Sequence, residues 1–247
     1  MHSITPYLRN PNHAITISVI GCGGTGSRLL PRLAQMNYAI KHFNNHPGFH
    51  VEAFDNDIVE PNNVGRQNFT LSDVGENKAY NIIGKCNMAY GTFWEADDKK
   101  FVVNKKSMNT NIIITCVDTP QLRVQIDDFY KKKEFDPTHF VNNYYTNYYW
   151  IDCGNGKNFG QVVLTDHDEL KTVIDLFPNY KNQKPEDQKF EGCASYAEKL
   201  EEQGLFINDK IAVECSEIIW KLLTQKEISV QGSIFNQATH RTEPLKI

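Results

Sequence analysis

Apolar residues in the first part of the chain follow the pattern of a buried strand and then that of a helix. Residues 14–20 are a run rich in β-branched side chains, which predicts a buried strand. A glycine cluster follows directly, and apolar residues then recur at the spacing of a helix that lies on a sheet. Pro31 falls inside this helix and favours a kink. The apolar positions of the helix are Leu29, Leu30, Leu33, Met36, Ile40 and Phe43.

A second strand and helix follow the same order. Residues 51–54 predict a short strand that ends at Asp55, and a loop rich in proline and asparagine continues to Leu71. Ser72 is typical of a helix N-cap, so we expect a helix from there to about Tyr90.

Residues 92–96 and 111–117 predict a third and a fourth strand. Thr119 and Pro120 are typical of the cap and the first residue of another helix. Because strand and helix alternate throughout this half, we expect an α/β protein with a Rossmann-like, doubly wound, mainly parallel sheet. Ligands of such sheets bind at the carboxyl ends of the strands.

The pattern changes at about residue 141 and favours more antiparallel pairing. An aromatic run from Tyr144 to Trp150 indicates either a core segment or an interface, and residues 160–164 predict a strand. The polar residues 178–192 predict a mobile loop. We expect two helices after it, at about 194–202 and 207–223, and two terminal strands. The whole chain, 1–247, then reads as one domain with a nucleotide-binding half (1–140) and a C-terminal half (141–247).

Composition narrows the class of protein. The net charge of −4 at pH 7 provides no basic stripe, which argues against nucleic acid as a main ligand. The mean hydropathy is −0.50, and no apolar run approaches the roughly 20 residues of a membrane span. The first residues lack a secretory signal pattern, which predicts a cytoplasmic location. The six cysteines form no C-x-x-C pair, so we expect no zinc.

The glycine cluster matches a nucleotide-binding motif. Gly21, Gly23 and Gly26 occupy the fixed positions of G-x-G-x-x-G, between a predicted strand and a predicted helix, and Gly24 lies between them. Glycines allow the backbone to approach a phosphate, and the helix N-terminus offers unpaired N–H groups. Asp55 ends the next strand and is suited to accept ribose hydroxyls, although a solvated carboxylate at a strand end explains it nearly as well.

The loop after Asp55 carries a more specific pattern. It reads D-x-D-x-V-x-x-x-N-x-x-R-Q from Asp55, then D-x-G-x-x-K from Asp73 to Lys78, with Cys-Val-Asp-Thr-Pro-Gln-Leu-Arg from Cys116 to Arg123 downstream. In this order and spacing the chain resembles the E1/ThiF/MoeB/HesA superfamily of ATP-dependent adenylyltransferases. Over its whole length it is most similar to the ThiF family protein of the plasmid-borne PRTRC system, through segments such as Asn63–Gln67 and Gln203–Asn208.

The resemblance implies roles for individual residues. It places Asp55 at the ribose, Asn63, Arg66 and Lys78 at the phosphates, and Asp118 at Mg²⁺ or the α-phosphate. Gln67 and Arg123 are further candidates. Taken singly, each has an ordinary alternative as a surface charge or a loop-capping side chain.

The reaction implied is attack by the C-terminal carboxylate of a small ubiquitin-like partner on the α-phosphorus of ATP, which yields an acyl-adenylate. A homodimer is implied as well. Many E1 enzymes pass the acyl group to a cysteine, and Cys193 is best placed for this because a predicted helix begins beside it and would lower the pKa of the thiol. A small, partly buried cysteine at a helix start is at least as common.

Two other functions stay open. The chain could keep ATP and the partner tail without turnover and act as a scaffold. An NAD-dependent oxidoreductase is a third possibility, but it leaves Arg66, Lys78 and Asp118 unexplained.

Overall fold

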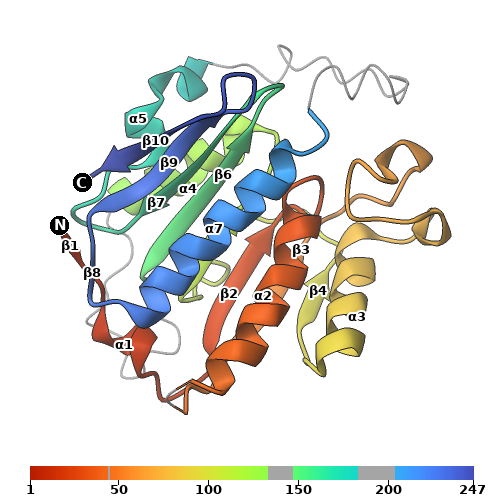
Figure 1. The fold of residues 1–247 in the computed structure, drawn as a ribbon, viewed down its shortest axis with the longest axis horizontal. Coiled ribbons are helices and arrows are strands. Elements are labelled where there is room, and N and C mark those ends of the chain that lie inside the picture. Colours follow the sequence, from red (N-terminus) through yellow and green to blue (C-terminus); the bar gives the residue numbers. More distant parts are fainter. Residues whose placement is uncertain (44, 133–146, 183–203) are drawn as a thin grey trace.

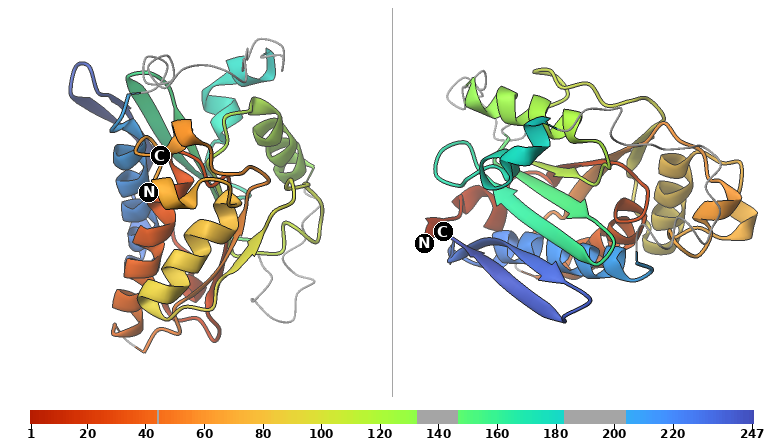
Figure 2. Two further views of the ribbon diagram at one scale, coloured as in Figure 1. Left: turned by 90° about the vertical axis from the view of Figure 1, so that its right-hand side faces the viewer. Right: turned by 90° about the horizontal axis from the view of Figure 1, so that it is seen from above.

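The computed structural model describes residues 1–43, 45–132, 147–182 and 204–247. An eight-stranded mixed sheet forms its centre, with the strand order β10-β9-β7-β6-β5-β2-β3-β4. Helices cover both faces of this sheet (Figures 1 and 2). The strands are β2 (Ile15–Ile20), β3 (Phe49–Phe54), β4 (Glu95–Asp97), β5 (Ile112–Thr115), β6 (Tyr149–Asn155), β7 (Phe159–Thr165), β9 (Val230–Asn236) and β10 (Arg241–Lys246).

The two halves of the sheet differ in direction, as predicted. Strands β4, β3, β2, β5 and β6 run parallel to one another, whereas the pairs β6–β7, β7–β9 and β9–β10 are antiparallel. A separate two-stranded pairing joins β1 (His2–Ser3) to β8 (Glu227–Ile228). The fold class inferred from the sequence is therefore confirmed.

Side chains of the central strands alternate between two cores. On β5, Ile112 and Ile114 pack into the larger core and Ile113 into the smaller one; on β6, Ile151 and Trp150 divide in the same way. Helices α2 (Gly26–Lys41), α3 (Lys78–Tyr90) and α7 (Ile207–Thr224) supply the larger core, and α4 (Pro120–Lys131) and α5 (Val173–Leu176) the smaller one. In the view from above, α7 and α4 lie on opposite faces of the sheet (Figure 2). Strands buried on both faces need apolar residues at successive positions, which explains the unbroken runs in the sequence.

The last two residues of the aromatic run belong to the core. Trp150 is fully buried and Tyr149 is 2% exposed, while Tyr144 lies outside the described residues. The short helix α1 (Pro6–Arg9) and the 3₁₀ helix η5 (Pro178–Asn182) complete the described elements together with η1 (Pro61–Asn63) and η2 (Leu71–Asp73). The predicted loop 178–192 thus begins as a 3₁₀ helix, and its remainder from 183 lies outside the described residues, as does the predicted helix 194–202.

One helix start was predicted wrongly. Ser72 is not the N-cap of α3; it lies inside η2, and the chain then turns at Gly75, whose φ is 95°. Asn77 is the true cap, because its side chain accepts a hydrogen bond from the backbone N–H of Tyr80 at 3.1 Å. The later start places Lys78 in the first turn of α3, beside the ends of β2 and β3.

The third strand is also shifted from 92–96 to Glu95–Asp97, since the Thr92 hydroxyl donates to Asn87 Oδ1 at 2.7 Å instead of facing a strand partner. Helix α2 continues past Pro31 to Lys41. Among the described helices, none is both long and apolar enough to cross a bilayer.

Candidate functional site

The glycine loop joins β2 to α2 and leaves no room for side chains at three of its positions, Gly21, Gly24 and Gly26. Gly21 has a φ of 92°, and a Cβ there would lie 2.6 Å from the carbonyl oxygen of Cys116. A Cβ on Gly26 would overlap the carbonyl oxygen of Gly21. A Cβ on Gly23 would meet only Gln67 Nε2, at 3.8 Å. Gly21 and Gly26 thus permit the tight turn, and the Gly23 position is open to a ligand.

Gly24 has a neighbour that the sequence did not indicate. A Cβ on Gly24 would lie 2.5 Å from Nδ2 of Asn208, in the first turn of α7. The Thr25 hydroxyl donates to Asn208 Oδ1 at 3.0 Å. Among the described residues, the backbone N–H groups of Gly24 and Thr25 find no hydrogen-bond acceptor. Unpaired N–H groups at the N-terminus of a helix are what an anionic phosphate needs.

Asp55 lies directly against this loop. Its carboxylate accepts hydrogen bonds from the backbone N–H of Cys22 at 2.6 Å and of Asp57 at 2.9 Å. Burial raises the pKa of Asp55, and these two hydrogen bonds oppose the rise. Asn77 Nδ2 holds the Asp55 carbonyl oxygen at 2.8 Å, so the start of α3 fixes the end of β3.

Lys78 is a buried cation with an exposed partner. Lys78 is 7% exposed, and its Nζ lies 3.1 Å from Oδ2 of Asp57, whose side chain is 62% exposed. The charge of Lys78 also acts on the Asp55 carboxylate and lowers its pKa. A cation held in this way, close to the glycine loop, can face a phosphate with little rearrangement.

The loop between Asp57 and Lys78 carries three more candidates, Asn63, Arg66 and Gln67. All three are buried, at 3%, 9% and 6% exposure. Asn63 Oδ1 accepts from the Glu60 backbone N–H at 2.9 Å, so this amide caps η1. Gln67 lies near Gly23, and within the described residues its Oε1 has no hydrogen-bond partner. A buried amide oxygen without a partner next to the glycine loop is suited to meet a ligand.

Arg28 was not among the sequence candidates, yet it connects three elements of the site. Its guanidinium lies 3.0 Å from Asp209 on α7 and donates to the carbonyl oxygens of Gly65 at 3.2 Å and Arg66 at 3.3 Å. The backbone N–H of Asn68 donates to Ser27 Oγ at 3.0 Å, and Asn68 Nδ2 donates to the Ser27 carbonyl oxygen at 3.1 Å. The loop that carries Arg66 is therefore anchored to α2. The only sequence signal for Arg28 was its place just after the glycine motif.

On the other side of the site, Asp118 and Arg123 follow β5. Asp118 is exposed, and its charge acts on Arg123. Arg123 is 2% exposed and donates through Nε to Asp152 Oδ1 at 2.7 Å and through Nη2 to the Cys153 carbonyl at 3.2 Å. Burial lowers the pKa of Arg123, but Asp152 outweighs this and raises it. Arg123 was a candidate for ligand binding, but its side chain forms a buried ion pair with Asp152.

The pKa of the thiol is raised in Cys22, Cys86, Cys116 and Cys153, which disfavours the thiolate. Cys116 is half-buried, and the other three are buried. Burial and the negative charge of Asp55 raise the pKa of Cys22, and a hydrogen bond to Cys153 together with burial raises that of Cys116. Cys193 lies outside the described residues, so its predicted role as an acyl acceptor stays a prediction.

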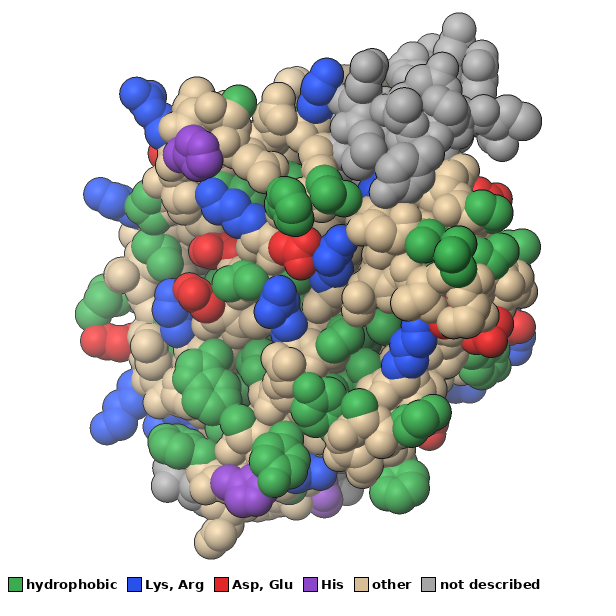
Figure 3. All heavy atoms as spheres, turned by 45° about the vertical axis from the view of Figure 1, so that its right-hand side comes forward, with side chains coloured by type: hydrophobic (Ala, Val, Ile, Leu, Met, Phe, Trp, Pro, Cys, Tyr) green, Lys and Arg blue, Asp and Glu red, His purple; other side chains and the backbone are tan. Residues whose placement is uncertain are grey.

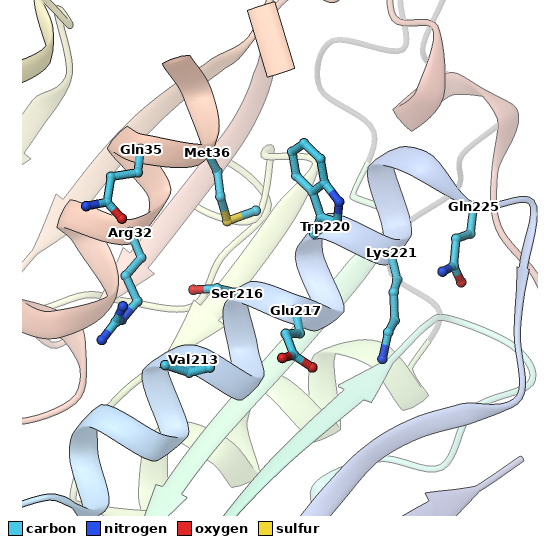
Figure 4. Close-up of a pocket in the computed structure, with 9 residues that line it drawn as sticks. All are labelled: Arg32, Gln35, Met36, Val213, Ser216, Glu217, Trp220, Lys221 and Gln225. Atoms are coloured by element: carbon cyan, nitrogen blue, oxygen red, sulfur yellow. The ribbon is translucent and has the colours of Figure 1, made fainter. Parts of the chain in front are cut away.

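One cavity lies away from the glycine loop. A groove of about 440 Å³ runs between the outer sides of α2 and α7 (Figure 4). Its lining mixes apolar side chains with both signs of charge: Arg32, Gln35, Met36, Val213, Ser216, Glu217, Trp220, Lys221 and Gln225. Acidic and basic side chains are also interspersed over the described part of the face in Figure 3. The convergence of backbone N–H groups, Asp55 and Lys78, and not cavity size, selects the candidate site.

Comparisons with known proteins identify the family and the fold of the chain. The family model described as ThiF family matches residues 12–197, so the chain belongs to the ThiF family. The structure of E. coli MccB with AMPCPP and MccA has a TM-score of 0.64 to this chain at 14% identity. That alignment covers 97% of this chain and 64% of MccB.

Two further structures give the same result. MccB with ATP has a TM-score of 0.61 at 16% identity, with 97% of this chain and 64% of MccB covered. PaaA has a TM-score of 0.58 at 15% identity, with 94% and 64% covered. At these identities the likeness establishes a shared fold. The chain spans about two thirds of the length of these proteins, and no curated protein sequence matches it.

Proposed function

We propose that this chain is an ATP-dependent adenylyltransferase of the E1-like type, a single domain over residues 1–247 that activates the C-terminal carboxylate of a small ubiquitin-like protein. The observation that carries the proposal is the meeting of the glycine loop, Asp55 and Lys78 at the carboxyl edge of the parallel strands. MccB, which shares the fold, has been solved with ATP and with MccA.

In this proposal, donors and cations bind the phosphates, and a carboxylate binds the ribose. The N–H groups of Gly24 and Thr25 and the cations Lys78 and Arg66 neutralise the phosphates, and Asp55 accepts hydrogen bonds from the ribose. Asn63 and Gln67 complete the phosphate side of the site. The partner carboxylate attacks the α-phosphorus in line, pyrophosphate leaves, and an acyl-adenylate forms.

Asp118 fits a Mg²⁺ ion. It is an exposed carboxylate after β5, and Mg²⁺ takes oxygen ligands while keeping several waters. The ion would neutralise phosphate charge when bound. We further propose a cytoplasmic homodimer and a place in a PRTRC system, both supported by the family resemblance.

Pyrophosphate exchange tests the proposal. We expect labelled pyrophosphate to enter ATP in the presence of Mg²⁺ and a ubiquitin-like protein encoded beside this chain, and Asp118→Ala to abolish the exchange. Asp128→Ala, which removes an exposed carboxylate from α4 outside the site, is the matched control and should retain exchange.

The scaffold alternative predicts a different outcome. A scaffold binds ATP and the partner but shows no exchange with any neighbouring partner. Binding of NADH in preference to ATP would instead favour an oxidoreductase and contradict the roles of Lys78 and Arg66.

A further inference from the structure

The start of α7 touches the glycine loop through one side chain. Asn208 is fully buried, and its Oδ1 accepts two hydrogen bonds: from the Thr25 hydroxyl at 3.0 Å and from Asn155 Nδ2 at 2.7 Å. Asn208 follows Thr25 by 183 positions in the chain. The contact therefore joins the C-terminal half of the protein to the proposed phosphate-binding turn.

Asn208 also explains why residue 24 is a glycine. A Cβ at this position would come within 2.5 Å of Asn208 Nδ2 and 2.9 Å of its Oδ1. Gly24 has no positive φ, so backbone conformation does not require a glycine here. The missing side chain makes room for the amide of Asn208 against the loop.

The Thr25 side chain also bonds to Asn208, and it does not cap its own helix. It occupies the N-cap position of α2, but its side chain makes no capping hydrogen bond. A threonine hydroxyl at an N-cap normally satisfies one N–H of the first helical turn. Here the hydroxyl turns to α7, and the N–H groups of Ser27 and Arg28 donate to the carbonyl oxygens of Gly23 and Thr25. Within the described residues, the N–H groups of Gly24 and Thr25 stay unpaired at this turn.

We propose that Asn208 is a positioning residue of the adenylating site: it fixes the Gly24–Thr25 turn so that the backbone N–H groups point to the phosphates of ATP. The inference rests on the proposed function. Asn208 itself does not touch the nucleotide. It acts through Thr25 and Gly24, which it contacts directly, and the Asn155 amide on β6 is a second donor to the same oxygen that does not touch the loop.

The test compares Asn208→Ala with Asn155→Ala. Asn155→Ala removes a hydrogen bond to the buried Asn208 Oδ1, and Asn208→Ala removes that oxygen itself. Both variants should therefore have a lower melting temperature. Only Asn208→Ala releases the glycine loop. We expect it to weaken AMPCPP binding and to raise the KM for ATP in pyrophosphate exchange by about tenfold, the equivalent of one lost hydrogen bond. Asn155→Ala should change either quantity by less than about threefold.

Thr25→Val probes the contact from the other side and serves if Asn208→Ala does not fold. It keeps the side-chain shape and removes the donor, so it should raise the KM for ATP as Asn208→Ala does. The double variant should be no weaker than Asn208→Ala alone, because both changes break the same contact.

The outcomes separate the inference from the function on which it rests. If the wild type binds no AMPCPP, the proposed function fails. If the wild type binds AMPCPP and Asn208→Ala and Thr25→Val bind it equally well, Asn208 is a packing residue and the inference is overturned. Equal losses of affinity in Asn208→Ala and Asn155→Ala would overturn it as well.

Discussion

Two sides of the candidate site hold their cations in different ways. On the β3 side, buried Lys78 pairs with Asp57, whose side chain is 62% exposed. On the β6 side, buried Arg123 pairs with Asp152, whose side chain is 1% exposed. The same family resemblance had made both Lys78 and Arg123 candidates for the site. Both cations are buried, so the difference lies in the exposure of their acidic partners. A cation with an exposed partner is free to bind a ligand, whereas a cation with a buried partner is part of the core.

The reason lies in desolvation. Asp57 keeps its water, so the pair with Lys78 can be broken at small cost, as the proposed function requires. Asp152 has given up its water and depends on Arg123, on the Thr115 hydroxyl at 2.7 Å and on the surrounding core. The β3 side is therefore expected to respond to mutation in activity, and the β6 side in stability.

The largest expected effect is on the β6 side. Arg123→Ala leaves the Asp152 carboxylate buried without its cation, and we expect the free energy of unfolding to fall by about 3–5 kcal/mol. Chemical denaturation measures the change. The double variant Arg123→Met/Asp152→Leu removes both charges and should recover most of the loss. A single variant as stable as the wild type would show that Arg123 is not needed in the core.

On the β3 side, Lys78→Ala should act on turnover. We expect pyrophosphate exchange to fall by about 10²-fold or more, because a preorganised charge at the phosphates is lost. The free energy of unfolding should change by about 1 kcal/mol or less, since Asp57 returns to water. Lys85→Ala removes another lysine from α3 and is the control that should retain exchange. Loss of stability without loss of exchange would reverse the comparison.

The sequence predicted most of the β3 side because its parts are local. A β-branched run, a glycine motif and a helical stripe follow each other without interruption, and chain order alone then places Asp55 at the end of the neighbouring strand. The start of α3 was missed because Gly75 interrupts the helix and Asn77, not Ser72, caps it. Capping residues were present at both places, and only the fold decides between them.

The remainder of the site depends on contacts between distant residues. Arg28 meets Asp209, 181 positions later, and Thr25 meets Asn208. Arg123 is bound by Asp152, 29 positions later on the next strand. No spacing in the sequence indicates such pairs, so a phosphate cation and a core cation look the same until the fold is known.

Between the two sides lies the glycine loop, where a small change should have an intermediate effect. In Gly26→Ala the new Cβ would overlap the Gly21 carbonyl oxygen, so the loop must shift, and we expect a loss of about 1–3 kcal/mol in the free energy of unfolding. Gly84→Ala is the matched control. It lies in α3 with open space around it and should be stabilising by about 0.5–1 kcal/mol. Equal effects of the two substitutions would mean that the loop adapts freely.

The smallest effect concerns pH on the β3 side. Asp73 is buried, and although burial raises the pKa of its carboxyl, hydrogen bonds from Lys85, Thr70 and Asn81 outweigh this and hold the pKa below its ordinary value. A carboxyl with a lowered pKa in the folded state stabilises the protein above its ordinary pKa and loses that contribution as the pH falls. The wild type should therefore lose stability below about pH 4.

Asp73→Asn removes this dependence. Because the Lys85 side chain is 41% exposed and solvent screens the pair, we expect the variant to be less stable by only about 1 kcal/mol at pH 7. The difference from the wild type should begin to shrink as the pH falls below about 4, because the Asp73 carboxyl of the unfolded chain then takes up its proton before that of the folded protein does. Denaturation curves at several pH values measure it. A constant difference at every pH would show that Asp73 stabilises the protein through its shape and hydrogen bonds, and that the charge of its carboxylate does not contribute to folding.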